Sequence, residues 1–272
     1  MGVHAEFRTA SVPVFRHACG LCPLQEWCWP PRMDESDLSR LHAIVRQTGF
    51  LPAGRHLFRA DDPFTAIYAV RSGCIKTYTI DLQGQERVRD FHLPDELLGF
   101  DAVYPERHHF NAMILKAASL CVIPYRDIAL LSGQFPGLQS RILALMSRDF
   151  SRQQRCFDGS DATQQIAIFL FDIETRLRRH GQVAFEFDLP MSHESIANYL
   201  RLAPETVSRV FSKLQQADII HVDRAHVSVK DVAHLSLIAQ GAQLAKIIGP
   251  EFDSRYRQAQ SSREVAHARC KN

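Results

Sequence analysis

The 272-residue chain lacks a hydrophobic run long enough to cross a membrane. Its longest apolar stretches, such as IAIFLF at 166–171, are far shorter than the roughly 20 residues of a membrane helix. The N-terminus also lacks the continuous apolar segment of a secretion signal. We therefore expect a cytoplasmic protein with no membrane partner.

The chain also has little net charge. Lys and Arg number 32 and Asp and Glu number 30, so the formal charge is +2, which gives only slight support for a nucleic-acid partner. A hydrophobic content of 46% with 23% charged residues is typical of a globular protein and argues against global disorder. The length favours two domains.

The chain has seven cysteines. Because disulfide frameworks are rare in cytoplasmic proteins, this number favours metal binding or redox chemistry. Cys19, Cys22 and Cys28 form a C-x2-C-x5-C array, and Cys121 lies far along the chain in a predicted strand. Four thiolates around one centre can bind zinc or an iron–sulfur cluster, and their spacing does not distinguish the two. Two further interpretations are a dithiol redox pair at Cys19 and Cys22, and Cys121 as a buried small apolar side chain.

Residues 54–124 alternate short β-rich runs with turn residues. The runs are HLFRA, AIYAVRS, CIKTYTI, ERVRDFHL, NAMILKA and SLCVIP. Turns are expected at Gly73, Gly84, Pro94 and Gly99. This pattern predicts an antiparallel sandwich or barrel, and Glu35–Gln47 before it reads as a short amphipathic helix.

A long helix without internal glycine or proline is predicted over Leu138–Phe157. Large side chains recur in it at alternating spacings of three and four, which is typical of a coiled-coil seam. The seam residues are Leu143, Met146, Phe150, Gln153 and Phe157. We favour a dimerisation helix, and the alternative is a helix packed on its own domain.

The segment MSHESIANYLRLAPETVSRVFSKLQ predicts a helix-turn-helix that reads DNA. Ser192 is a natural N-cap for the first helix, and Pro204 suits the first position of the second. The strand pair IIHVD/HVSVK, turned around Arg224-Ala225, would form a wing.

Three polar side chains lie on the outer, N-terminal side of the predicted second helix. Arg209 can donate two hydrogen bonds to guanine, Glu205 can accept one from cytosine, and Ser208 can contact a base or a phosphate. Phosphate contacts are expected from Arg201, Lys213, Arg224 and Lys230. The alternative is a solvated helix face carrying a Glu205–Arg209 ion pair.

The order of cysteine arm, β-roll, long helix and winged helix resembles the FNR branch (fumarate and nitrate reductase regulator) of the cyclic-AMP receptor protein superfamily. The likeness extends from Cys19 to about Val229. Its motifs are the C-x2-C-x5-C array with Cys121-Val122-Ile123-Pro124, Phe91-His92-Leu93-Pro94 continuing to Leu98-Gly99-Phe100-Asp101-Ala102, and Glu205-Thr206-Val207-Ser208-Arg209.

The resemblance implies an α+β fold with an N-terminal cysteine arm, an antiparallel β-roll sensor domain, a long dimerisation helix and a C-terminal winged helix-turn-helix. The expected divisions are a cluster-ligand arm at 1–31, the β-roll at 32–136, the dimerisation helix at 137–160, the DNA-binding domain at 161–240 and a polar tail at 241–272.

The resemblance also implies that Cys19, Cys22, Cys28 and Cys121 bind an oxygen-labile [4Fe–4S] cluster. In the family, the cluster promotes dimerisation and binding to a palindrome of TTGAT-type half-sites under anaerobic conditions, and oxygen inactivates the protein. Loops near Gln83–Arg87 correspond to a region that contacts RNA polymerase.

Two departures and two alternatives bear on these expectations. The stretch PDELLGFDAVYPERHHFNAM lacks the Arg-Ser pair of cyclic-AMP binders, so we expect no cyclic nucleotide. Pro23 after the second cysteine and two tryptophans around the third could alter access to the cluster. The alternatives are a regulator of the same fold that uses structural zinc, haem or another redox signal, and an enzyme with dithiol chemistry. No catalytic base accompanies the cysteines, so we expect no enzyme.

Overall fold

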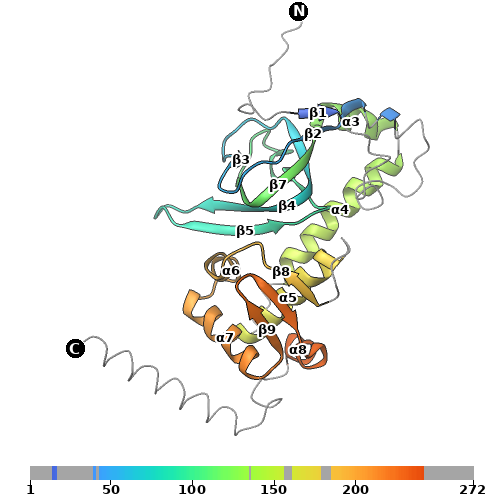
Figure 1. Cartoon of the computed structure of the whole chain (residues 1–272). Helices are drawn as coiled ribbons and strands as arrows, with labels where there is room; N and C mark the ends of the chain where they lie inside the picture. Colours follow the sequence, from blue (N-terminus) through green and yellow to red (C-terminus); the bar gives the residue numbers. More distant parts are fainter. Residues whose placement is uncertain are drawn as a thin grey trace, which may run out of the picture. The chain divides into compact units, whose positions relative to one another are not determined.

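The computed structural model describes residues 14–16, 39–40, 43–134, 136–155, 161–178 and 185–241. The chain divides into two compact units, Met1–Arg155 and Cys156–Asn272, which are described separately (Figure 1). Within the described parts, no helix is long and apolar enough to span a bilayer. Cys19, Cys22, Cys28, Phe157 and the tail after 241 lie outside the described residues.

The N-terminal unit is built on one seven-stranded antiparallel sheet rolled into a β-roll (Figure 1). Its strands are β1 Val14–Arg16, β2 Arg46–Thr48, β3 His56–Phe58, β4 Ala66–Ile80, β5 Glu86–His92, β6 Leu97–Leu98 and β7 Asn111–Pro124. The main order is β1-β2-β7-β4-β5, with β3 beside β7 and β6 beside β4. The two longest strands, β4 and β7, pair from Ala66↔Pro124 to Tyr78↔Asn111 and form the backbone of the roll.

Two pairs of runs that the sequence separates are single strands in the structure. AIYAVRS and CIKTYTI both belong to β4, and NAMILKA and SLCVIP both belong to β7. The turn expected at Gly73 is wrong, because this residue lies inside β4 at an irregularity in the register. Its φ is +86°, and a Cβ there would lie 2.4 Å from the carbonyl oxygen of Ala117. Gly73 therefore lets the paired strands bend together without ending.

The helix expected over Glu35–Gln47 is wrong at its C-terminal end. Residues 39–40 and 43–44 are helical, but Arg46 and Gln47 belong to strand β2. β2 pairs with β7, so long-range sheet hydrogen bonding overrides the local helical pattern.

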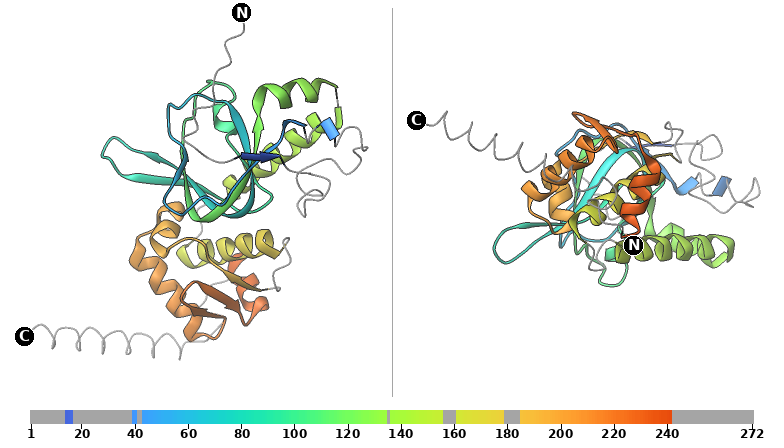
Figure 2. Two further views of the ribbon diagram at one scale, coloured as in Figure 1. Left: turned by 45° about the horizontal axis from the view of Figure 1, so that its top comes forward. Right: turned by 90° about the horizontal axis from the view of Figure 1, so that it is seen from below.

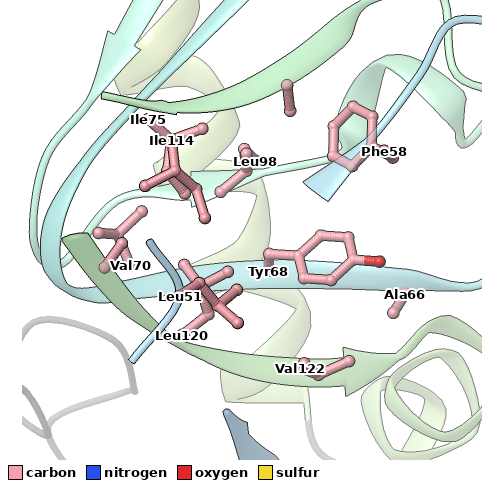
Figure 3. Packing of buried hydrophobic residues seen from close by; sticks show 12 residues of the cluster. Leu51, Phe58, Ala66, Tyr68, Val70, Ile75, Leu98, Ile114, Leu120 and Val122 are labelled. Atoms are coloured by element: carbon pink, nitrogen blue, oxygen red, sulfur yellow. The ribbon is translucent and has the colours of Figure 1, made fainter. Parts of the chain in front are cut away.

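Side chains on β4 and β7 alternate between two apolar clusters, as the period of two in a strand requires. Leu120 and Val122 belong to the cluster inside the roll, hereafter the roll core (Figure 3). Cys121 and Ile123 belong to a second cluster that includes residues of the following helices, hereafter the helix-side core. The roll core comprises Leu51, Phe58, Ala66, Tyr68, Val70, Ile75, Leu98, Ala112, Ile114, Ala118, Leu120 and Val122.

Two helices, α3 (Tyr125–Gln134) and α4 (Pro136–Arg155), follow β7. The sequence pattern indicated α4 but not α3. Ile128 from α3 and Leu138 and Leu145 from α4 are at most 3% exposed in the helix-side core. Both helices are therefore packed onto the sheet beside Cys121.

The C-terminal unit combines helices with a small antiparallel sheet (Figure 2). Its elements are α5 Ala162–Arg178, β8 Glu186–Asp188, α6 His193–Leu200, α7 Pro204–Gln216, β9 Ile220–Asp223, β10 His226–Val229 and α8 Val232–Ala239. The sheet order is β8-β10-β9, and α8 packs on α5. The expected helix-turn-helix and wing strands are present, and β8 adds a third strand to the wing.

The clash at Gly73 predicts a large difference between two glycine substitutions. Gly84 also has a positive φ, +76°, but a Cβ added at Gly84 would meet nothing within 4 Å. We expect Gly84→Ala to lower the free energy of unfolding by about 1 kcal/mol, and Gly73→Ala by about 3 kcal/mol or more, because backbone strain and overlap add. Denaturant unfolding of both variants measures this, and equal losses would contradict it.

Candidate DNA interface and cysteine site

Helix α6 begins as the sequence predicts. Ser192 is its N-cap, and the Ser192 hydroxyl accepts a hydrogen bond from the backbone N–H of Ser195 at 3.2 Å. The ring of His193 lies 4.4 Å from the ring of Phe211 on α7, so the two helices touch at their aromatic side chains. Burial lowers the pKa of His193 below its ordinary value of 6.5.

Helix α7 begins at Pro204, which occupies its first turn as expected. Its buried side is the apolar set that the spacing predicts: Val207, Val210, Phe211 and Leu214. This stripe fixes the rotation of α7 about its own axis. The opposite side therefore faces solvent.

Glu205, Ser208 and Arg209 all lie on the exposed side of α7, within its first two turns. The N-terminal part of a recognition helix is the part that meets base edges in the major groove. Ser208 also accepts a hydrogen bond, through its backbone carbonyl, from the hydroxyl of Ser212 at 2.9 Å. The three side chains are therefore accessible to a partner that approaches the N-terminal half of α7.

The wing is tied to α7 by a contact that sequence reasoning missed. The Gln215 side-chain oxygen accepts a hydrogen bond from the backbone N–H of Val222 in β9 at 2.9 Å. A glutamine at the end of a helix carries no signal of its own, so the sequence offers no way to find it. Arg224 and Lys230 are exposed beside this wing, Arg201 is exposed in the turn before α7, and Lys213 is partly exposed on α7.

The fourth cysteine of the expected ligand set is buried. Cys121 is 8% exposed in the helix-side core, where it shares the cluster with Leu138 and Leu145 of α4. In the described part of the chain, no three His, Cys, Asp or Glu side chains gather into a metal site. That part does not include Cys19, Cys22 or Cys28.

The sheet aligns the start of the cysteine arm with Cys121. Phe15 in β1 pairs with Gln47 in β2, and Gln47 pairs with Cys121 in β7. Adjacent strands are about 4.8 Å apart, so the Cα atoms of Phe15 and Cys121 are separated by about 10 Å. The three-residue strand β1 has no clear signal in the sequence, because its pairing partner β2 is distant along the chain.

Helix α4 carries two apolar faces. Leu138, Ile142 and Leu145 pack on the helix-side core. The expected seam residues Leu143, Met146 and Phe150 are 58%, 39% and 63% exposed. Successive residues are about 100° apart around a helix. The exposed seam of Leu143, Met146 and Phe150 therefore lies roughly a quarter of a turn or more away from the face that packs on the helix-side core. Gln153 lies in the last turn of α4.

Two family profiles match the chain. The Crp-like helix-turn-helix domain matches residues 164–238, and the cyclic nucleotide-binding domain matches residues 49–132. The first contains α6, α7 and the wing, and the second contains the roll from β3 onward and most of α3.

Proteins of known role are similar over most of the chain. The "Transcriptional activator protein anr" of Pseudomonas aeruginosa is 38% identical over 82% of this chain and 93% of its own length. The "Fumarate and nitrate reduction regulatory protein" of Vibrio cholerae is 35% identical over 81% and 90%. The chain belongs to the FNR branch of the Crp–Fnr family. Like other Crp–Fnr regulators, it is a DNA-binding transcription regulator and not an enzyme.

Solved structures confirm the Crp–Fnr fold. FixK2 from Bradyrhizobium japonicum has a TM-score of 0.66 at 21% identity, covering 74% of this chain and all of that one. A putative cAMP-binding regulatory protein from Silicibacter pomeroyi has a TM-score of 0.56 at 23% identity, covering 77% and 93%. The predicted combination of β-roll, long helix and winged helix-turn-helix is therefore correct.

The Crp–Fnr roll of this chain has an apolar interior. The twelve buried side chains of the roll core occupy the space between its strands (Figure 3). A separate cavity of about 20 Å³ lies in the helix-side core, lined only by apolar side chains such as Ile67, Ile128 and Leu145. It has room for about one water molecule.

The lowered pKa of His193 predicts a pH dependence of stability. The unfolded chain takes up a proton near pH 6.5, whereas the folded state resists it, so the free energy of unfolding falls as the pH drops below about 6.5. His193→Phe keeps an aromatic ring against Phe211 and removes the titrating group. Denaturant unfolding at about pH 7 and pH 5.5 should show a smaller loss in this variant than in the wild type. An identical loss in both proteins would refute the assignment to His193.

Proposed function

We propose that this regulator responds to oxygen and acts under anaerobic conditions. It would bind a TTGAT-type palindrome as a homodimer, with a [4Fe–4S] cluster held by Cys19, Cys22, Cys28 and Cys121. Relatives named "Anaerobic regulatory protein" in Pasteurella multocida (34% identical) and "Electron transport regulator A" in Shewanella oneidensis (32%) support this assignment. The observation that carries it is the alignment of Phe15, Gln47 and Cys121 across three strands.

The residues present fit such a group. Four cysteines are the usual ligand set of a [4Fe–4S] cluster. Cys19 follows Phe15 by four residues, and four residues span at most about 14 Å, which exceeds the roughly 10 Å between Phe15 and Cys121. The arm can therefore bring its cysteines to Cys121. When bound, the cluster would supply an oxygen-reactive redox centre.

The packing of Cys121 offers a route from the cysteine site to α4. Cys121 shares the helix-side core with Leu138 and Leu145, which are 1% and 3% exposed. Because a close-packed cluster transmits small displacements, a change in the position of Cys121 would shift α4 relative to the sheet. The sequence-based dimer seam lies on the same helix.

Dimerisation would bury the exposed face of α4. Leu143, Met146 and Phe150 expose large apolar side chains at spacings of three and four. Association of two α4 helices would remove these side chains from water, and in the sequence Gln153 and Phe157 continue the same spacing. The dimer would present two α7 helices to successive major grooves about 34 Å apart.

The DNA contacts follow from the exposed surface of α7. Arg209 would read guanine, Glu205 cytosine, and Ser208 a base or phosphate, while Arg201, Lys213, Arg224 and Lys230 would contact phosphates.

Two further features bear on partners. The tip of the β4–β5 hairpin exposes Leu82 fully and Ile80 by 59%, next to the Gln83–Arg87 loop that we propose contacts RNA polymerase. We also propose that the roll binds no cyclic nucleotide, because the stretch PDELLGFDAVYPERHHFNAM lacks the Arg-Ser pair of cyclic-AMP binders.

The cluster assignment predicts unequal effects of two cysteine substitutions. Cys74 and Cys121 are both buried in the N-terminal unit, but only Cys121 belongs to the proposed ligand set. We expect Cys121→Ser to lose its anaerobic affinity for a TTGAT-type duplex and Cys74→Ser to retain it. Fluorescence anisotropy under anaerobic conditions measures both. Wild-type affinity in Cys121→Ser would sink the cluster proposal, and equal losses would point to a general loss of stability.

The base-reading assignment predicts a change in specificity. Arg209→Ala should lose about 1–3 kcal/mol of binding free energy on the preferred site and relax discrimination at one base pair. Lys213→Ala, on the same helix, should weaken all sequences alike because phosphates are common to them. Affinities for a set of single-base variants of the palindrome test this. A uniform loss in Arg209→Ala would make Arg209 a phosphate contact instead.

A further inference from the structure

Three helices of the C-terminal unit end in the same left-handed turn. The left-handed residue directly follows α6 at Arg201, with φ +57°, and lies two residues beyond the end of α8 at Gly241, with φ +97°. Asp218, with φ +55°, likewise lies two residues beyond the end of α7. Glycine is the usual residue at this position, because a Cβ makes the left-handed conformation unfavourable.

The hydrogen bonds at Arg201 and Asp218 have the same pattern. Leu202 donates its N–H to the carbonyl of Ala197 at 2.9 Å, and Arg201 donates to Asn198 at 3.3 Å. At the end of α7, the corresponding bonds run from Ile219 to Leu214 and from Asp218 to Gln215, both at 3.0 Å. The two helix ends are therefore matched in geometry and differ in the residue that carries the strain.

Arginine is the least expected of the three residues. Aspartate is several-fold enriched in the left-handed region, whereas arginine has no such preference. Arg201 is exposed in the turn between α6 and α7, two residues before the cap of α7 and close in sequence to Glu205. A strained residue persists where the surroundings hold it and where its side chain has a use.

The turn of the wing also carries an arginine with a positive φ. Asp223 and His226 are paired across β9 and β10, and Arg224 begins the two-residue turn between them with φ +55°. A positive φ in such a turn favours glycine or asparagine. Among the residues that the structure describes, Arg201 and Arg224 are the only basic side chains with positive φ, and both lie in turns of the DNA-reading unit.

We propose that Arg201 and Arg224 hold the DNA backbone on the two sides of α7, and that the fold accepts strained turns in order to place them there. The inference builds on the phosphate contacts of the proposed function and adds that these two contacts are made at the expense of stability. It predicts that replacing either arginine with glycine raises the stability of the fold and lowers its affinity for DNA.

The test compares Arg201→Gly with Asp218→Gly in the full-length protein. Both changes relieve a left-handed residue, so the thermal unfolding midpoint should rise by a few degrees in each. Only Arg201→Gly should weaken binding to DNA. The probes are a mixed-sequence duplex of about 30 base pairs and a duplex with the TTGAT-type palindrome, each titrated under anaerobic conditions at several salt concentrations.

A phosphate contact has a distinctive salt signature. The slope of log affinity against log salt concentration should shrink by about 0.9 in Arg201→Gly, by the same amount on both duplexes, and recover in Arg201→Lys. Arg224→Gly should behave as Arg201→Gly does. The lysine variant keeps the charge and the Cβ, so it separates the loss of the contact from a change in the turn.

Three outcomes would overturn the proposal. Unchanged affinity and salt slope in Arg201→Gly would remove the phosphate contact, while leaving DNA binding by the wild type intact. A lower unfolding midpoint in Arg201→Gly would show that Arg201 does not destabilise the fold, and would refute that part of the proposal. If the wild type bound neither duplex, the proposed function itself would fail, and the inference with it.

Discussion

The antiparallel pairing of β4 with β7 is the constraint on which the N-terminal unit depends. Because side chains alternate along β7, Leu120 and Val122 enter the roll core, and Cys121 is directed to the opposite face. A register shift of one residue would exchange these faces and remove Cys121 from α4. The same strand pairs with β2, which in turn pairs with β1 at the start of the cysteine arm. Strand β7 thus contributes to the roll core, fixes the direction of Cys121 and, through β2, aligns β1 with it.

The helices after β7 leave an apolar face exposed beside the packed one. α4 is seated on the sheet by Leu138 and Leu145, which leaves Leu143 and Phe150 exposed on the neighbouring face. In the C-terminal unit, the buried stripe of α7 and the hydrogen bond from Val222 to Gln215 set the direction of the recognition surface. In each unit, the packing of one face of a helix therefore fixes the direction of the exposed face to which we assign a function.

Local signals in the sequence account for what could be predicted. The helix-turn-helix is found because Ser192 and Pro204 have their effects within one turn of the helices that they begin. The continuity of β4 could not be predicted, because Gly73 has the sequence signature of a turn but accommodates a bulge against Ala117. β1 and β2 depend on partners distant in sequence, so Arg46 and Gln47 resemble the end of a helix. The exposed face of α7 was inferred from spacing, and the burial of Cys121 was one of two interpretations of that residue, but the alignment of Phe15 with Cys121 required the sheet register.

The most direct test of the account is an anaerobic purification followed by exposure to air. Iron and acid-labile sulfide should each amount to about four per chain, with a visible absorption band that bleaches in air as affinity for the TTGAT-type duplex falls. A colourless protein that contains zinc and binds this duplex equally well with and without oxygen would contradict the oxygen response, while leaving the fold and the DNA reader in place.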